Sequence, residues 1–208
     1  MNVIIFGATG SIGKHLIEQS LKKGHQVTAF GRSIDQLASH QQLKKIKGNV
    51  FDLNAVQEAV KGQEAVIVVL GAGISSGSNV RSQGTLNIIK AMQNNGVKRL
   101  ICQTTLGAGD SRGNLNFFWK YIMFGGLLKR MFLDHELQEK HVRNSSLNWT
   151  IVRPGSFTDG PKTGHYKHGF SPTDRSVNLK IARADVADFI VQQLDATHYL
   201  FKSPGLSY

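Results

Sequence analysis

The sequence predicts an α/β protein in which a doubly wound parallel sheet carries helices on both faces. Short β-branched runs alternate with longer stretches of helical periodicity. Several of the short runs are apolar at every position, as expected of parallel strands that are covered on both sides. The 208 residues, 40% hydrophobic and 19% charged, correspond to one globular domain over residues 1–208.

Six of the short runs are predicted to be strands. In chain order they are Val3–Phe6, Gln26–Phe30, Lys44–Lys47, Ala65–Leu70, Arg99–Gln103 and Thr150–Val152. A glycine- and serine-rich stretch at 71–78 follows the fourth run, and we interpret it as a binding loop. It contains a GxSxG pattern around Ser75, but this serine lies several residues past the strand. A hydrolase nucleophile needs a sharp strand-to-helix turn, so we do not assign one here.

Four of the longer stretches are predicted to be helices. The first places its apolar residues at helical spacing and ends before Gly24, and the second does the same before Gly96. Those apolar positions are Ile12, Leu16, Ile17 and Leu21 in the first, and Thr85, Ile88, Ile89 and Met92 in the second. Two later helices are predicted at His135–Arg143 and Ala184–Leu194.

The segment at 111–133 departs from this alternation. It contains no acidic residue, four cations and six aromatic residues. The cations are Arg112, Lys120, Lys129 and Arg130, and the aromatic residues are Phe117, Phe118, Trp119, Tyr121, Phe124 and Phe132. We interpret the segment as an insert near the substrate. A lid, a dimer surface, an interfacial membrane helix and a helix whose apolar side packs on the domain all remain open.

Several classes of protein are excluded by composition. No run of eighteen apolar residues is present, so we expect no membrane span. The N-terminal residues lack the basic region of a signal peptide. A single cysteine, Cys102, allows neither an internal disulfide nor a cysteine-based zinc site, and we expect no metal. These features favour the reducing cytoplasm.

The charge balance indicates an anionic partner. The chain has 25 basic and 14 acidic residues, which give a net charge of +11. The cations are scattered and accompany no recognition motif, so we do not expect nucleic-acid binding. An acidic lipid and a phosphorylated cofactor both remain open as the anionic partner. We expect a monomer or a weak homo-oligomer.

The strongest motif joins the first strand to the first helix. Gly7, Gly10 and Gly13 lie at GxxGxxG spacing. We expect Gly7 to permit the tight turn, Gly10 to let a pyrophosphate approach the backbone, and Gly13 to let the helix pack on the strand. The helix N-terminus then offers N–H groups to the phosphates. The sequence therefore predicts a Rossmann-like dinucleotide site whose turn also includes Thr9, Ser11 and Ile12.

The residues after the second strand favour NADP(H) over NAD(H). NAD-selective sites carry an acid there, and this chain has Arg32 and Ser33. A guanidinium group and a hydroxyl group suit a 2′-phosphate. The nearest acid, Asp35, is interpreted as a residue at a helix start.

The chain resembles the short-chain dehydrogenase/reductase superfamily in its atypical branch. The resemblance rests on GATGSIG, AFGRS, GNVFDL, VIVVLGAG, LNWTIVRPGSFTDG and RADVADFI, and it extends over nearly the whole chain. Within that branch it is similar to flavin/biliverdin reductase B-like and NmrA-like proteins. The resemblance implies that Asp52 and Leu53 end the third strand and flank the adenine. It also implies that Leu70, Gly71 and Ala72 line the dinucleotide crevice, and that the backbone of Pro154, Gly155, Ser156 and Phe157 holds the carboxamide.

The usual acid–base pair of this superfamily is missing. None of the four tyrosines is followed by lysine four residues later. Met131 stands at the family's tyrosine position and His135 at its lysine position. Met131 cannot donate a proton, so alcohol oxidation in the usual manner is not expected.

The remaining residues suit hydride transfer from NADPH to a planar, conjugated acceptor such as a flavin, a quinone or a tetrapyrrole. Thr104 and Thr105 are expected to orient the nicotinamide or the acceptor. His135 either supplies a proton or polarises the acceptor, or it is an ordinary histidine on the helix surface. Ser156 stands where the reductase relatives carry histidine, which leaves the acceptor open. The alternative function is a non-catalytic, NmrA-like redox sensor that binds NADP(H) and acts through a protein partner.

Overall fold

An eight-stranded, mostly parallel sheet forms the centre of the protein. A computed structural model describes residues 1–72 and 78–208. The strand order is β3-β2-β1-β4-β5-β6-β10-β8, and only β8 runs antiparallel to its neighbour. The strands are β1 Asn2–Phe6, β2 Gln26–Gly31, β3 Leu43–Lys47, β4 Ala65–Val68, β5 Arg99–Gln103, β6 Asn148–Pro154, β8 Lys167–His168 and β10 Gly205–Ser207. A separate parallel pair consists of β7 Ser156–Thr158 and β9 Lys180–Ala182.

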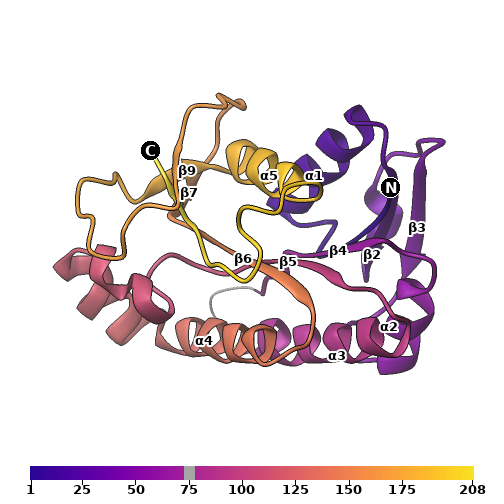
Figure 1. Ribbon diagram of the computed structural model, residues 1–208, viewed down its shortest axis with the longest axis horizontal. Helices are drawn as coiled ribbons and strands as arrows, with labels where there is room; N and C mark the ends of the chain where they lie inside the picture. Colours follow the sequence, from indigo (N-terminus) through magenta and orange to yellow (C-terminus); the bar gives the residue numbers. More distant parts are fainter. Residues whose placement is uncertain (73–77) are drawn as a thin grey trace.

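Helices cover both faces of this sheet (Figure 1). One face carries α1 Ser11–Lys22 and α5 Arg183–Gln192, and the other carries α2 Leu53–Val60, α3 Val80–Asn94 and α4 Lys129–Arg143. Alternate residues of β1 enter opposite cores. Val3 and Ile5 belong to the cluster that includes α1 and α5, whereas Ile4 and Phe6 belong to the cluster that includes α2 and α3. This alternation explains why Val3–Phe6 of the strand are all apolar. The predicted doubly wound fold is confirmed.

All six predicted strands are present, with changed ends. The fourth ends at Val68, two residues earlier than predicted, and the sixth runs from Asn148 to Pro154. The short strands β7 to β10 and the helix α2 were not predicted. The four strands are two or three residues long, too short to show an alternation of polar and apolar residues.

The chain changes direction across the sheet at β1. From β1 it first winds outward to β2 and β3, and it then returns to β4 on the other side of β1. Loops that leave the carboxyl ends of β1 and β4 therefore diverge, and a crevice opens between them. The crevice is where a Rossmann-type sheet binds its ligand.

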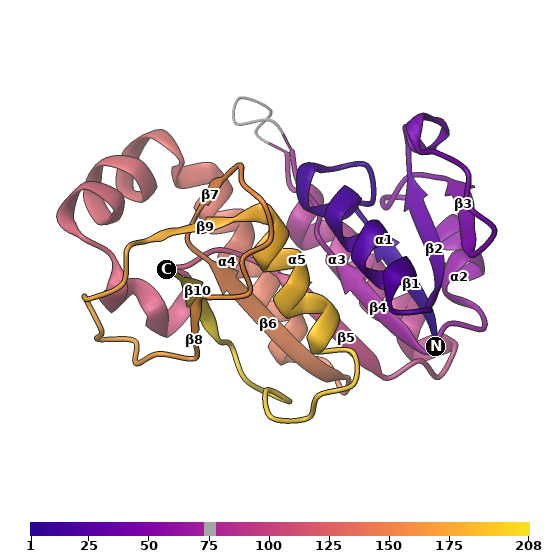
Figure 2. The same ribbon diagram turned by 90° about the horizontal axis from the view of Figure 1, so that it is seen from above.

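The basic aromatic insert folds into two short helices ahead of α4. A 3₁₀-helix spans Gly109–Asn114 and a π-helix spans Phe118–Leu127. Both lie at the opposite end of the molecule from β3 (Figure 2). Phe124 packs inward and stacks on Phe132 at a centroid distance of 4.7 Å. Phe117 is 71% exposed and Leu127 is 74% exposed, so the packed-helix interpretation describes one side of the insert only.

Within residues 1–72 and 78–208, no helix is both long enough and apolar enough to cross a bilayer.

Candidate cofactor and substrate site

A cavity of about 610 Å³ opens at the crevice beside β1. The turn after β1, the ends of β2 and β4, the start of α3 and the middle of α4 all contribute to its walls. Among the predicted cofactor residues, those that line it are Gly7, Thr9, Gly10, Ser11, Ile12, Arg32, Leu70, Gly71, Ala72, Thr104 and Phe157. The structure therefore brings most of the predicted site together in one place.

The glycine-rich turn is fixed by close backbone contacts. Gly7 has a φ angle of +92°, and a Cβ atom there would lie 2.4 Å from the carbonyl oxygen of Val69. A Cβ atom on Gly13 would lie 2.3 Å from the carbonyl oxygen of Gly7. Only glycine fits either position, because the clashing atoms belong to the backbone. Gly10 lines the cavity itself, so ligand atoms can reach the backbone there.

The N-terminus of α1 faces the same cavity. Gly10 precedes the helix, no side chain caps it, and its first turn contains no acidic residue. The first N–H groups of a helix have no partner within the helix, and they carry the positive end of its dipole. Ser11 and Ile12 of this turn line the cavity. This end of the cavity is therefore suited to phosphate groups.

Arg183, at the start of α5, supports this turn, and the sequence analysis did not identify it. Its Nε donates to Ser11 Oγ at 3.0 Å, and its guanidinium group lies 5.4 Å from the ring centre of Phe157. Asp159 accepts from its Nη1 at 2.6 Å. The only signal in the sequence was the RADVADFI motif, which gives no contact to Ser11. The pairing joins residues 172 positions apart, and no local pattern encodes it.

Arg32 is exposed at the end of β2 and lines the cavity. Ser33 does not belong to the residues that line it. Asp35, the competing acid, lies in the first turn of a short 3₁₀-helix and forms an ion pair with Lys47 at 2.9 Å. The Lys47 ammonium group lowers the pKa of Asp35. The carboxylate that would disfavour a 2′-phosphate is thus engaged by a cation.

The prediction that Asp52 and Leu53 end the third strand is wrong, and neither residue lines the cavity. The third strand ends at Lys47, and Asp52 is the N-cap of α2. Its carboxylate accepts hydrogen bonds from the backbone N–H groups of Asn54 and Ala55 at 3.0 and 3.1 Å. The residues that line the cavity here are Asn49, Val50 and Phe51.

The predicted carboxamide contacts at Pro154–Phe157 are only partly supported. The Gly155 N–H donates to Leu206 at 2.9 Å and the Ser156 N–H donates to Leu179 at 2.7 Å. These donors are used by neighbouring backbone and are not free for a ligand. Pro154, Gly155 and Ser156 line a separate small pocket beside the insert, whereas Phe157 lines the main cavity.

The opposite end of the cavity is formed by Gln103, Thr104, Met131 and His135. Met131 and His135 lie one turn apart on α4, and both line the cavity. Thr105, a predicted catalytic residue, does not line the cavity, and its hydroxyl group lies 3.3 Å from the carbonyl oxygen of Leu106. No tyrosine lines the part of the cavity that the structure describes.

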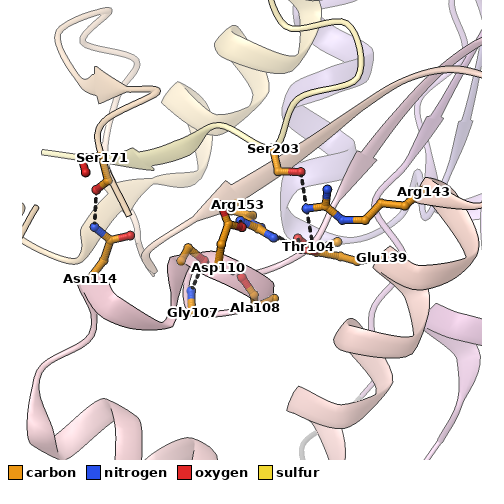
Figure 3. Close-up of polar contacts among 11 residues, drawn as sticks. Thr104, Gly107, Ala108, Asp110, Asn114, Glu139, Arg143, Arg153, Ser171 and Ser203 are labelled. Carbon is orange, nitrogen blue, oxygen red and sulfur yellow. Dashed lines mark hydrogen bonds and ion pairs between the residues drawn. The ribbon is translucent and has the colours of Figure 1, made fainter. Parts of the chain in front are cut away.

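A buried ion pair holds this end in place (Figure 3). Arg153 on β6 contacts the Glu139 carboxylate twice, from Nε at 2.9 Å and from Nη2 at 2.7 Å. Thr104 donates its hydroxyl hydrogen to the same carboxylate at 2.8 Å. Burial alone would lower the pKa of Arg153, but the hydrogen bonds and charges of Glu139 and Asp110 raise it. The Thr104 hydroxyl can therefore offer a ligand only its lone pairs.

His135 is a buried, neutral group. It is 5% exposed, so the interpretation as a surface histidine is wrong. Burial and the positive charge of Arg81 lower its pKa to about 3, although the hydrogen bond with Gln138 opposes the shift. Its Nδ1 lies 3.1 Å from Gln138 Oε1, an acceptor, and this places the proton on Nδ1. At neutral pH the residue therefore has no acidic proton for a ligand.

The GxSxG pattern around Ser75 lies outside the described residues. In the described parts of the chain, no group of three His, Cys, Asp or Glu side chains is placed to hold a metal ion.

Comparison with known proteins identifies the chain's relatives. The sequence model of a family described as NAD(P)H-binding matches residues 7–197. The UPF0659 protein YMR090W of Saccharomyces cerevisiae is 30% identical, over 93% of this chain and 87% of its own length.

Solved structures give the same result. ChuY of Escherichia coli O157:H7, described as an anaerobillin reductase, aligns with a TM-score of 0.83 and 25% identity over 100% of this chain and 97% of its own. A short-chain dehydrogenase/reductase of Veillonella parvula, solved with NADP, aligns with a TM-score of 0.82 and 19% identity over 100% of this chain and 94% of its own. The chain therefore belongs to the NAD(P)H-binding family, with the fold of the atypical short-chain dehydrogenases/reductases.

Proposed function

We propose that this protein is an NADPH-dependent reductase that acts on a planar, conjugated acceptor such as a flavin, a quinone or a linear tetrapyrrole. One observation carries the proposal. The cavity is lined by the glycine-rich turn and by Met131 and His135, which the resemblance assigns to the superfamily's tyrosine and lysine positions. When bound, NADPH supplies hydride, and a conjugated acceptor can take its proton from water.

Arg32 supports NADPH as the cofactor. Its guanidinium group is exposed at the cavity edge, and the neighbouring carboxylate of Asp35 is paired with Lys47. A 2′-phosphate there would form a charge-assisted hydrogen bond with Arg32. The Veillonella parvula relative solved with NADP is consistent with this choice.

The walls of the cavity suit a reaction without an acid in the protein. Among the described residues that line it there is no Asp, Glu, Lys or Tyr. Met131 and Phe157 offer apolar surface to a planar ring system. The protein would orient the acceptor against the nicotinamide and leave water to supply the proton, which is sufficient when the acceptor is already electron-poor. ChuY, described as an anaerobillin reductase, supports an acceptor of this class.

The alternative is a redox sensor that binds NADP(H) without turnover. The missing proton donor at Met131 fits this function equally well. The two are separated by mixing the full chain with NADPH and FMN, FAD, biliverdin or menadione, and following the nicotinamide absorbance band. Oxidation by one acceptor in a saturable manner supports the reductase. Tight NADPH binding without oxidation by any of them would contradict it and favour the sensor.

A further inference from the structure

Arg81 is a buried cation at the wall of the cavity. It lies in the first turn of α3, its side chain is 9% exposed, and it lines the cavity. An arginine is almost never buried to this extent unless an anion pairs with it. Burial of Arg81 therefore calls for an anion close to its guanidinium group.

The nearest carboxylate, Asp134, is already engaged. Its Oδ1 accepts from the Ser82 N–H at 3.0 Å and from the Ser82 hydroxyl at 2.5 Å. Its Oδ2 accepts from the backbone N–H of Arg81 at 3.2 Å. The guanidinium Nη1 lies 3.8 Å from this Oδ2, which is beyond hydrogen-bond distance. Asp134 thus caps the start of α3 and offsets the charge of Arg81 without using its donors.

The guanidinium group is paired with Asp134 through the 3.8 Å ion pair, which opposes the lowering of the Arg81 pKa by burial, but no hydrogen bond of 3.5 Å or shorter joins it to residues 1–72 or 78–208. Its nitrogen atoms are also absent from the buried polar atoms that lack both a partner and access to solvent. The donors therefore face the open space of the cavity, which Arg81 lines. A guanidinium group in this state has up to five N–H donors for an incoming oxyanion.

The position of Arg81 assigns it to the acceptor end. Arg81 lies beside Asp134 on α4, next in sequence to His135, and its charge reaches His135 strongly enough to lower the pKa of that imidazole. Arg32 lies at the end of β2, on the other side of β1. The described lining of the cavity holds these two permanent cations and no acid.

We propose that Arg81 binds an anionic group, a carboxylate or a phosphate, on the acceptor, so that this site selects negatively charged conjugated acceptors over neutral ones. The inference rests on the proposed reductase function and narrows its substrate class. A guanidinium fork matches both oxyanions in a bidentate manner, and burial strengthens the contact because water competes less. The rival assignment, in which Arg81 contacts the cofactor's diphosphate, is an outcome of the test.

The test uses two acceptor pairs that differ in charge, biliverdin with its dimethyl ester and FMN with riboflavin. The wild-type protein is expected to prefer the charged member of the pair it reduces by about ten- to a hundredfold in kcat/KM. Arg81→Gln is expected to abolish that preference while the KM for NADPH changes less than twofold. Arg81→Lys keeps the charge and is expected to retain part of the preference. Lys90→Gln, an exposed change on α3 away from the cavity lining, is the matched control and should leave it intact.

Failure of the reductase function is separated from failure of this inference by binding measurements. The same four compounds are titrated into the protein loaded with NADP⁺, and tryptophan quenching is recorded. Binding of biliverdin or FMN that depends on Arg81, without turnover, would support the anion site and contradict the reductase. Equal binding or turnover of charged and neutral compounds by the wild-type protein would overturn the inference, even if Arg81→Gln does not fold. A tenfold weaker NADPH affinity in Arg81→Gln or Arg81→Lys would overturn it too.

Discussion

Thr104, at the end of β5, donates its hydroxyl hydrogen to Glu139 on α4 across 2.8 Å. The same carboxylate pairs with Arg153 on β6, which is 1% exposed. Two strands and a helix therefore meet at one buried charge directly behind the cavity. The position of Thr104 toward a ligand depends on that pair.

We predict that Glu139→Gln strongly destabilises the fold. The substitution removes the charge that balances the buried Arg153, and breaking such a pair costs about 3–5 kcal/mol. Urea unfolding followed by circular dichroism measures the loss. Glu58→Gln removes a carboxylate from an exposed pair with Lys61 and should cost less than about 1 kcal/mol. Similar losses for the two variants would contradict a special role of the buried pair.

We predict that Gly13→Ala weakens NADPH binding by at least about tenfold. The new methyl group would lie 2.3 Å from the Gly7 carbonyl oxygen, so α1 must shift away from the phosphate-binding turn. Such overpacking also costs about 1–3 kcal/mol of stability. Calorimetric titration with NADPH measures the affinity. Gly126→Ala in the insert, where a methyl group meets no atom within 4 Å, is the control and should bind normally.

We predict that Arg32→Ala weakens NADPH binding by about ten- to a hundredfold and leaves NADH binding nearly unchanged. The lost interaction is a charge-assisted hydrogen bond, worth about 1.5–3 kcal/mol. Ser33→Ala is the control, because Ser33 does not line the cavity. Fluorescence titration with NADPH and with NADH measures the two affinities. Equal losses for NADPH and NADH would refute the assignment of Arg32 to the 2′-phosphate.

We predict that His135 makes the protein less stable as the pH falls from about 6.5 toward 3. The pKa of the folded-state imidazole is about 3, below its unfolded value, so the unfolded chain binds the proton more tightly in this range. The contribution of His135 to the free energy of unfolding is fully present above the unfolded pKa, and it is lost as the pH falls toward the folded-state pKa. The contribution approaches about 1.4 kcal/mol per pH unit. His135→Gln should flatten the curve of unfolding free energy between pH 6.5 and pH 5, whereas His40→Gln, an exposed change, should not. Parallel curves of unfolding free energy against pH for the wild type and His135→Gln would contradict this role of His135.

The sequence was most informative where a feature is local. The strand β1 was recognised because Val3–Phe6 are all apolar. The turn at Gly7–Gly13 was recognised because the spacing of its glycines is typical of a turn in which backbone segments approach closely. Met131 and His135 both line the cavity, because they lie one turn apart on α4. These features require only neighbouring residues.

Long-range relationships were not predictable. The pair of Glu139 with Arg153 and the contact of Arg183 with Ser11 join elements that meet only after the sheet has formed. Asp52 was assigned to the end of the third strand, whereas that strand ends at Lys47 and a loop separates it from Asp52 at the start of α2. Burial of His135 and Arg81 depends on how α3 and α4 pack together, so neither the low pKa of the histidine nor the free donors of the arginine could be read from periodicity.

Calorimetric titration of the full chain with NADPH and with NADH tests the central claim most directly. The account predicts saturable binding of NADPH, at least about tenfold tighter than that of NADH. The absence of saturable heat with both nucleotides up to millimolar concentrations would contradict it.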